Sequence, residues 1–263
     1  MSPIGIIGFR RAIDLVGASI AIDSPVAGYE ATFLRSPRQA AKTRSTDLAT
    51  CDIVTDCGQP VPIGALTLYG GNWTTAAVLT WAANDTDSWG SPAVSGAILS
   101  HPGRIHMLLP RVYQYRYWRV RIVDAANPAG YLELGMCDWW LTVELQEPPT
   151  LTSLSEGISD VSPRVVMSHG DAVSRAVPTA LELTVAEWTG LRRAHALELW
   201  RHLRDLASGS PVFLAPEAGT GLYSRAVYGS MRAAPTLKPA DPAWTTWTLG
   251  GMVVEADREA ASA

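Results

Sequence analysis

Charge of either sign is scarce in this chain, and lysine is almost absent. Charged residues make up 17% of the 263 residues, against about 25% in a typical soluble domain. Lys42 and Lys238 are the only lysines, so arginine supplies nearly all of the positive charge. A weakly charged, arginine-rich surface is typical of proteins that act through interfaces, although a GC-rich coding sequence also favours arginine over lysine. The net charge of -4 gives no general attraction for phosphates, so we expect no nucleic-acid partner.

Cysteine and metal-binding motifs are also scarce. The chain has three cysteines, an odd number: Cys51, Cys57 and Cys137. They form no CxxC pair, and no second pair of Cys or His residues lies at the spacing of a structural zinc site. We interpret them as reduced, packed thiols, and a disulfide between Cys51 and Cys57 is the alternative. Residues 84–87 (NDTD) offer a few oxygen ligands, but calcium takes about six to eight, so a solvated turn is the preferred interpretation. The sequence predicts no metal and no cofactor.

Long apolar runs and catalytic motifs are missing as well. No apolar run approaches the roughly 20 residues that a membrane-spanning helix needs. The apolar N-terminus carries Arg10, Arg11 and Asp14 in its middle, unlike a signal peptide. We therefore expect a soluble chain that is made in a cytoplasm and does not insert into membranes. Because no GxSxG elbow, HExxH helix or P-loop occurs, we also expect that the protein is not an enzyme.

The first part of the chain, residues 1–148, reads as a β domain without helices. Short apolar or alternating runs are separated by Gly, Pro, Asn and Asp, which are turn residues. The predicted strands lie at residues 65–69, 77–81, 105–109, 117–123, 131–134 and 141–145. Regularly spaced short strands favour a β-sandwich or jelly roll.

The pattern changes in the second part of the chain. Residues 149–164, with Pro-Pro and repeated Ser and Thr, predict a linker or long loop. Residues 165–256 read as strands around one helix. That helix is predicted over residues 185–207, because a Thr-x-x-Glu capping box at 184–187 precedes apolar residues at steps of three and four. Residues 257–263 predict a disordered tail.

Aromatic residues and arginines gather at residues 115–135. In a strand, alternation separates an inner set from an outer set: Trp118, Val120 and Ile122 inward, and Tyr117, Arg119 and Arg121 outward. The turn sequence NPAG predicts that residues 131–134 return as the antiparallel partner. The outer set either stacks on a sugar or a partner, or covers the sandwich with arginine stems, and the second interpretation is preferred.

Tryptophans are concentrated in the first part of the chain, where core filling is the default interpretation. Trp73 and Trp89 are flanked by Gly, Asn, Ser and Thr and are therefore the two most expected in loops. Together with Tyr117, Arg119 and Arg121, they are our candidates for contact with a glycan or a protein partner.

Three segments of the first part resemble successive signatures of discoidin-like, carbohydrate-binding-module jelly rolls. They begin with GASIAIDSP, IGALTLYGG and YRYWRVRIVD, and the resemblance covers roughly residues 18–145. In that family an early strand leads to a polar Arg-Ser or Arg-Thr step, and a late RYWRIxIxD strand closes the sandwich. The resemblance implies a discoidin-like jelly roll. Many such modules hold calcium or display loop aromatics for sugar, and neither set can be read from this sequence.

The second part is similar to the C-terminal part of tail-tip and baseplate proteins of long-tailed, siphovirus-like bacteriophages. The matching positions are the SPVF run at 210–213 and the Tyr-Gly pair at 228–229. This resemblance implies a tail-tube-like β-sandwich that carries one α-helix.

The two resemblances together imply a structural protein of a phage tail tip. Such a protein assembles as a homo-oligomeric ring around the tail axis, in the virion tail, and joins the tail tube to the hub and host-recognition parts. The alternative is a lectin-like module that binds cell-surface glycan for host attachment. A third alternative, a cell-wall hydrolase, lacks a visible catalytic constellation.

Overall fold

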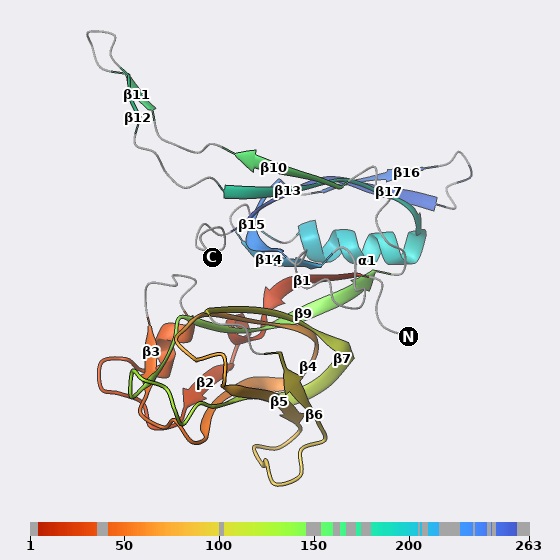
Figure 1. Ribbon diagram of the computed structural model, residues 1–263. Coiled ribbons are helices and arrows are strands. Elements are labelled where there is room, and N and C mark those ends of the chain that lie inside the picture. The colour runs from red at the N-terminus through yellow and green to blue at the C-terminus, as the bar shows by residue number, and fades with distance from the viewer. Residues whose placement is uncertain are drawn as a thin grey trace. The chain divides into compact units, whose positions relative to one another are not determined.

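The computed structural model describes the chain in several stretches. These are residues 5–35, 42–99, 103–145, 154–159, 164–166, 172–174, 180–204, 206, 210–215, 227–233, 235–240, 243 and 246–256. They form a mainly β protein with one α-helix (Figure 1). The chain divides into two compact units, residues 1–144 with 218–224 and residues 145–217 with 225–263. The predicted fold class, mainly β sandwich with one helix, is confirmed.

The first unit is built from strands, with two short 3-10 helices. Its elements are β1 (Gly5–Arg11), η1 (Ala12–Asp14), β2 (Ser19–Ile22), η2 (Ala31–Arg35), β3 (Thr43–Ser45), β4 (Cys51–Gly71), β5 (Val78–Asn84), β6 (Val94–Ile98), β7 (Gly103–Val123), β8 (Leu132–Leu134) and β9 (Met136–Leu145). Each of the six strands predicted in this part of the chain overlaps one of these elements.

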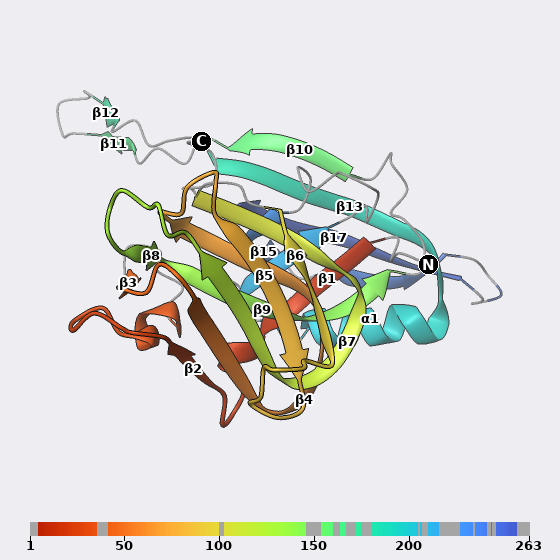
Figure 2. The ribbon, with the colours of Figure 1, turned by 60° about the horizontal axis from the view of Figure 1, so that its bottom comes forward.

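Two long strands organise the first unit. The main sheet runs in the order β1-β9-β4-β7-β5-β6, and β3 pairs with β8 in a separate sheet (Figure 2). The first part of β4 lies between β2 and β7, and its later part lies between β9 and β7. The register of β4 against β7 shifts between Asp56 and Val61 and again between Ile63 and Ala65. These irregularities let one strand serve two sets of neighbours.

The predicted pairing of residues 117–123 with residues 131–134 is wrong. Strand β7 has β4 on one edge and β5 on the other, so no edge remains for β8. The turn after β7 is held by Asp124, whose carboxylate accepts hydrogen bonds from the backbone N–H and the hydroxyl of Thr74. Strand β8 pairs with β3 instead.

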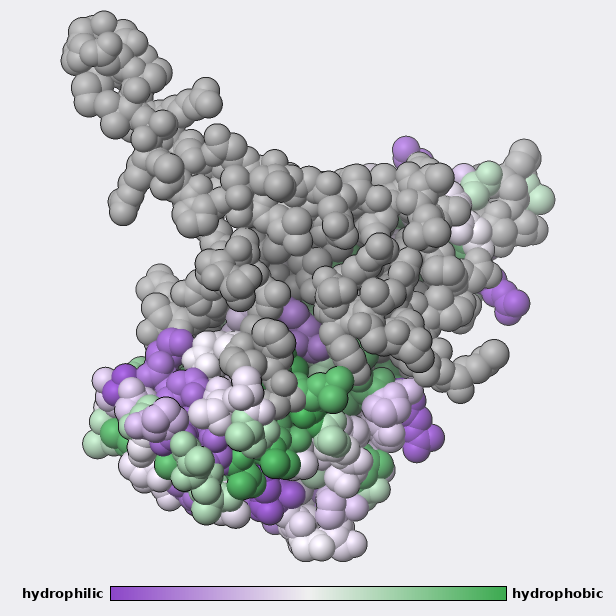
Figure 3. All heavy atoms as spheres, in the orientation of Figure 1, coloured by the Kyte–Doolittle hydropathy of each residue, from purple (hydrophilic) through white to green (hydrophobic). Residues whose placement is uncertain are grey.

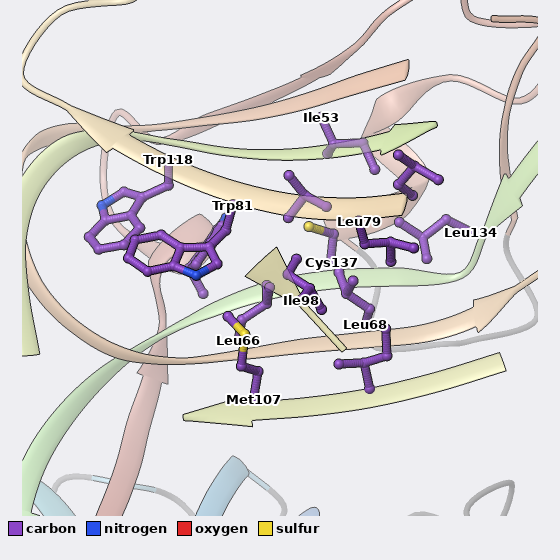
Figure 4. Packing of buried hydrophobic residues seen from close by; sticks show 14 of the residues in the cluster. Ile53, Leu66, Leu68, Leu79, Trp81, Ile98, Met107, Trp118, Leu134 and Cys137 are labelled. Atoms are coloured by element: carbon purple, nitrogen blue, oxygen red, sulfur yellow. The ribbon is translucent and has the colours of Figure 1, made fainter. Parts of the chain in front are cut away.

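Tryptophans form the centre of the core in the first unit. Trp118 is fully buried, with its ring centroid 4.9 Å from that of Trp139 and 6.4 Å from that of Trp81. Figure 4 shows Trp81 of β5 and Trp118 of β7 side by side. Val120 and Ile122 are also buried, so the predicted alternation along this strand is confirmed. Buried aromatic rings supply much of the apolar area that stabilises such a core.

The cysteines are buried and free, which confirms their interpretation as packed thiols. Burial raises the pKa of Cys51 to about 11 and that of Cys57 to about 12. The alternative, a disulfide between Cys51 and Cys57, is wrong, because both cysteines lie on the same strand, β4. Six residues of extended strand span roughly 20 Å, several times the reach of a disulfide.

The second unit combines a sheet with one helix. Its elements are β10 (Leu154–Ser159), β11 (Arg164–Val166), β12 (Ala172–Ser174), β13 (Ala180–Arg192), α1 (Arg193–Arg204), β14 (Pro211–Ala215), β15 (Val227–Ala233), β16 (Thr236–Pro239) and β17 (Thr246–Ala256). The sheet order is β10-β13-β17-β15-β14, with β16 beside β17, while β11 and β12 pair separately. Helix α1 contacts β13, β16 and β17. No helix among the described residues is long and apolar enough to cross a membrane.

The predicted start of the helix is wrong. Residues 184–187, interpreted as a capping box, lie in β13, where Thr184 is opposite Val253 and Val185 is opposite Met252 of β17. Pairing with β10 and β17 satisfies backbone groups on both edges of β13, whereas a cap satisfies only local donors. The helix begins at Arg193, after a register shift at Gly190, whose φ is 82°.

Two other predictions concern the ends of the second unit. Residues 149–164 were predicted to be a linker or long loop. Strand β10 lies within this segment, so the segment is not wholly a linker or loop. The proposed tail at residues 257–263 lies outside the described residues.

Candidate functional site

The outer face of β7 carries arginines whose partners are aspartates of β4. Asp52 accepts two hydrogen bonds from Arg121, each 2.6 Å long, and one from Arg119 at 3.1 Å. Asp56 accepts two hydrogen bonds of 2.8 Å from Arg116. The hydrogen bonds that Arg121 donates to Asp52 raise the pKa of Arg121, whereas burial lowers the pKa of Arg119. These pairs agree with the preferred interpretation that the arginines cover the sheet.

Tyr117, another candidate from the sequence, belongs to the same set of contacts. Its side chain is partly exposed, and its proximity to Asp56 helps to lower the pKa of that carboxyl, for which Arg116 is the main cause. The guanidinium of Arg116 lies 4.8 Å from the centroid of its ring. Tyr117 is therefore held beside the arginine–aspartate pairs rather than presented alone.

Trp73 lies in the loop between β4 and β5, as predicted, but its side chain is only 2% exposed. Its ring packs so closely beneath Gly71 that a Cβ added to that glycine would overlap it. A buried ring has no face available to a sugar or a partner. The structure therefore removes Trp73 from the candidate contact residues.

Trp89 lies in the loop between β5 and β6 and is partly exposed. Its Nε1–H donates a 2.7 Å hydrogen bond to Asp87. The guanidinium of Arg119 lies 4.6 Å from the centroid of its ring, and Arg119 itself is 7% exposed. The two arginines, Arg119 and Arg121, therefore meet at Asp52, and Trp89 joins this group through its contact with Arg119.

A second cluster escaped the sequence analysis. The guanidinium carbon of Arg44 lies 4.1 Å from the ring centroid of Tyr29 and 4.7 Å from that of Tyr131. The Nε–H of Arg44 donates a 2.8 Å hydrogen bond to Glu133, and Lys42 Nζ lies 3.8 Å from the other oxygen of that carboxylate. All five side chains are partly exposed. We call these five residues the Tyr–Arg cluster.

The backbone around the Tyr–Arg cluster holds its members in place. Arg44 of β3 and Glu133 of β8 are direct cross-strand partners. The amide of Asn72 donates a 3.0 Å hydrogen bond to the carbonyl of Tyr131 and accepts a 2.7 Å hydrogen bond from the N–H of Glu133. The N–H of Arg44 donates to the carbonyl of Tyr29 at 3.1 Å. The cluster is therefore organised before any ligand arrives, which lowers the entropic cost of binding.

The charges of the Tyr–Arg cluster are two cations and one carboxylate. The hydrogen bond to Glu133 raises the pKa of Arg44, so its guanidinium stays positively charged. Among the residues that the structure describes, the two terminal nitrogens of Arg44 have no hydrogen-bond acceptor. The N–H groups on these two nitrogens are therefore donors in one plane beside two aromatic rings. This geometry suits the binding of carboxylate, sulfate or hydroxyl groups.

Sequence reasoning missed this cluster because Arg44 and Glu133 are 89 residues apart. Arg44 lies in an Arg-Ser-Thr run, which by itself indicates only a polar loop step, and Tyr131 and Glu133 lie in a segment whose pattern indicates only a strand. No local pattern indicates that the two segments pair. A cross-strand contact between distant segments is a property of the fold.

Comparison with solved structures gives matches over about half of this chain. One is CpGH89CBM32-6 produced by Clostridium perfringens, with 9% identity, a TM-score of 0.40, and coverage of 50% of this chain and 99% of that chain. Another is the Streptococcus pneumoniae fucose binding module SpX-3, with 10% identity, a TM-score of 0.40, and coverage of 50% and 97%. The lectin domain of lectinolysin, complexed with Lewis B antigen, has 14% identity, a TM-score of 0.40, and coverage of 48% and 94%.

Two of these three proteins are named for binding glycan. No protein-family model matches the chain, and no curated protein matches it. Because the structural matches concern the fold alone, the choice of a ligand has to rest on the residues of this chain. On the face of the first unit that Figure 3 draws, hydrophilic and hydrophobic residues are interspersed.

Proposed function

We propose that the first unit is a lectin-like module and that the Tyr–Arg cluster is its glycan-contact surface. The observation that carries the proposal is a planar cation held between two partly exposed tyrosine rings beside a carboxylate. Aromatic rings offer apolar area to the C–H faces of a pyranose, and the guanidinium and carboxylate offer donors and acceptors to its hydroxyl groups. The chain acts by binding rather than by catalysis.

Stability alone explains this cluster poorly. The side chains of Arg44 and Glu133 are 29% and 18% exposed, and exposed ion pairs typically contribute only about 0–1 kcal/mol. By contrast, the side chains of Arg119 and Asp52 are 9% and 11% exposed, so their pairing has a clear structural role. Two tyrosines and a lysine gathered around an exposed pair are better explained by recognition of a ligand.

The excess of positive charge defines the class of glycan. Lys42 and Arg44 face one carboxylate, Glu133, so the cluster favours saccharides that carry carboxylate or sulfate groups. An amino sugar would meet two like charges. The proposed order of affinity is therefore acidic glycan first, neutral glycan next and amino-bearing glycan last.

A glycan array followed by calorimetry on the best ligand tests the proposal. Arg44→Ala and Tyr131→Ala are expected to weaken binding at least about tenfold, equivalent to about 1.4 kcal/mol. Arg116→Ala is the matched control, because Arg116 also pairs with a carboxylate and stacks on a tyrosine, Tyr117, but outside the cluster. Unchanged binding in Arg44→Ala, or equal losses in Arg44→Ala and Arg116→Ala, would reject the Tyr–Arg cluster as the site.

For the whole chain we further propose a role in a phage tail tip, which rests on the sequence resemblance of the second part. In this proposal the chain is made in the bacterial cytoplasm, forms a homo-oligomeric ring in the virion tail and contacts tube and hub proteins. The first unit would then contribute host attachment. Mass measurement across a concentration series, with negative-stain images and a search for the protein in purified virions, tests this role. A strict monomer that is absent from virions contradicts it.

A further inference from the structure

We infer that Trp89 forms a second glycan contact, separate from the Tyr–Arg cluster, that takes a neutral or amino-bearing pyranose. The inference rests on the proposed function, because both sites take a glycan as the ligand. It differs in location, in charge and in the residue that carries it.

The indole of Trp89 is held rigidly in a loop, although it is partly exposed. Its N–H is bound to Asp87 at 2.7 Å, and one ring face lies on the buried guanidinium of Arg119 at 4.6 Å. The loop is braced by the amide of Asn84, which donates a 2.8 Å hydrogen bond to the carbonyl of Ser88. Since one face is covered by Arg119, the exposed area belongs to the rest of the indole. A rigid exposed tryptophan contributes contact area with little loss of side-chain entropy.

The two sites lie at opposite ends of β5. The loop before Val78 contains Asn72, which holds the Tyr–Arg cluster, and the loop after Asn84 contains Trp89. Seven residues of strand separate these loops by roughly 20 Å. Figure 1 shows the loop between β5 and β6, in yellow, extending from the first unit away from its β3 end. One monosaccharide cannot contact both sites.

The charge around Trp89 is opposite to that of the Tyr–Arg cluster. Asp85 and Asp87 are exposed in the same loop, and residues 84–93 contain no lysine, arginine or histidine. The two arginines of this group, Arg119 and Arg121, are both already paired with Asp52. Carboxylate oxygens accept hydrogen bonds from hydroxyl or ammonium groups and repel acidic groups. Trp89 therefore supplies a stacking face, and its acidic surroundings select against acidic sugars.

Fluorine NMR of the intact protein labelled with 5-fluorotryptophan tests this inference. Trp89→Phe identifies the Trp89 resonance and keeps an aromatic ring over Arg119. We then titrate the wild type with methyl glucoside, glucosamine and glucuronate. The Trp89 resonance is expected to shift with the first two sugars, with several-fold weaker affinity for glucuronate. The same shifts are expected in Arg44→Ala.

Each outcome decides the inference. A Trp89 resonance that moves with none of the three sugars means that the ring only covers Arg119. Loss of the shifts in Arg44→Ala would mean that Trp89 is not a separate site, and equal affinity for glucuronate would remove the role of the acidic loop. Failure of the Tyr–Arg cluster is detected separately, as unchanged glycan-array binding by Arg44→Ala, so the two proposals can fail independently.

Discussion

Removal of the Asp52 carboxylate is expected to be among the most damaging single changes on the outer face of the first unit. Asp52 binds Arg121 through both oxygens and also binds Arg119. Arg119 lies under the indole of Trp89 and is 7% exposed. In Asp52→Ala its positive charge would remain buried without a carboxylate partner.

The size of this effect follows from the burial of the pair. Removing one partner of a buried ion pair costs about 3–5 kcal/mol, whereas an exposed pair contributes about 0–1 kcal/mol. The side chains of Arg119 and Asp52 retain 9% and 11% exposure, so we expect a loss near the lower end, about 3 kcal/mol. With a urea m-value of about 2 kcal/mol/M, the unfolding midpoint of the first unit would fall by roughly 1.5 M.

Asp56→Ala is the matched control in the same assay. Asp56 also lies on β4 and forms two hydrogen bonds with an arginine, but its side chain is 22% exposed and that of Arg116 is 40% exposed. We expect its midpoint to change by no more than about 0.5 M. Urea unfolding followed by tryptophan fluorescence compares the two variants. Equal losses, or a loss below about 1 kcal/mol in Asp52→Ala, would refute the argument that burial of Arg119 sets the cost.

Two further changes test the interior of the first unit. Burial raises the pKa of Asp138 to about 7, so between about pH 4 and pH 7 the folded state keeps a proton that the unfolded state has lost. The free energy of unfolding of the wild type should therefore fall by up to roughly 4 kcal/mol as pH rises through that window, and the fall should be smaller in Asp138→Asn. Urea unfolding midpoints at several pH values test this. If the midpoints of the wild type and of Asp138→Asn change equally with pH, the prediction is wrong. Gly71→Ala should cost about 1–3 kcal/mol because its Cβ overlaps the ring of Trp73, while Gly90→Ala, with no heavy atom within 4 Å of its Cβ, should stay within about 0.5 kcal/mol. Thermal melts compare these two, and equal melting temperatures would contradict the predicted overlap.

Much of the fold of the first unit could be predicted because strand patterns are local. Alternation along β7 assigned Trp118 and Val120 to the core, and both are fully buried. Arg121, predicted on the outer side, is partly exposed, whereas Arg119, predicted on the same side, is buried against Trp89. Their aspartate partners could not be predicted, because the side chains meet across β4 and β7, 67 and 69 residues apart.

Local signals failed where tertiary pairing competed with them. The Thr-x-x-Glu pattern at residues 184–187 matches the sequence of a capping box, but the segment lies in β13, where β17 and β10 give it backbone partners on both edges. Trp73 has the flanking residues of an exposed loop, yet its ring is buried beneath Gly71. In both cases the sequence pattern is correct locally and is overridden by burial or by pairing with a distant strand.

By itself, the sequence determined the mainly β class, the presence of a helix in the second part, strand segments that overlap β4, β5, β7, β8 and β9, and the side of β7 that faces the core. These follow from periodicity and turn residues, which act over a few neighbouring positions. Only the tertiary structure decided that β8 pairs with β3, that Trp73 is buried while Trp89 is partly exposed, and that Tyr29, Arg44 and Tyr131 meet. The physical reason is that pairing and burial depend on which distant segments share the free edges and faces of a sheet, and no local pattern encodes that choice.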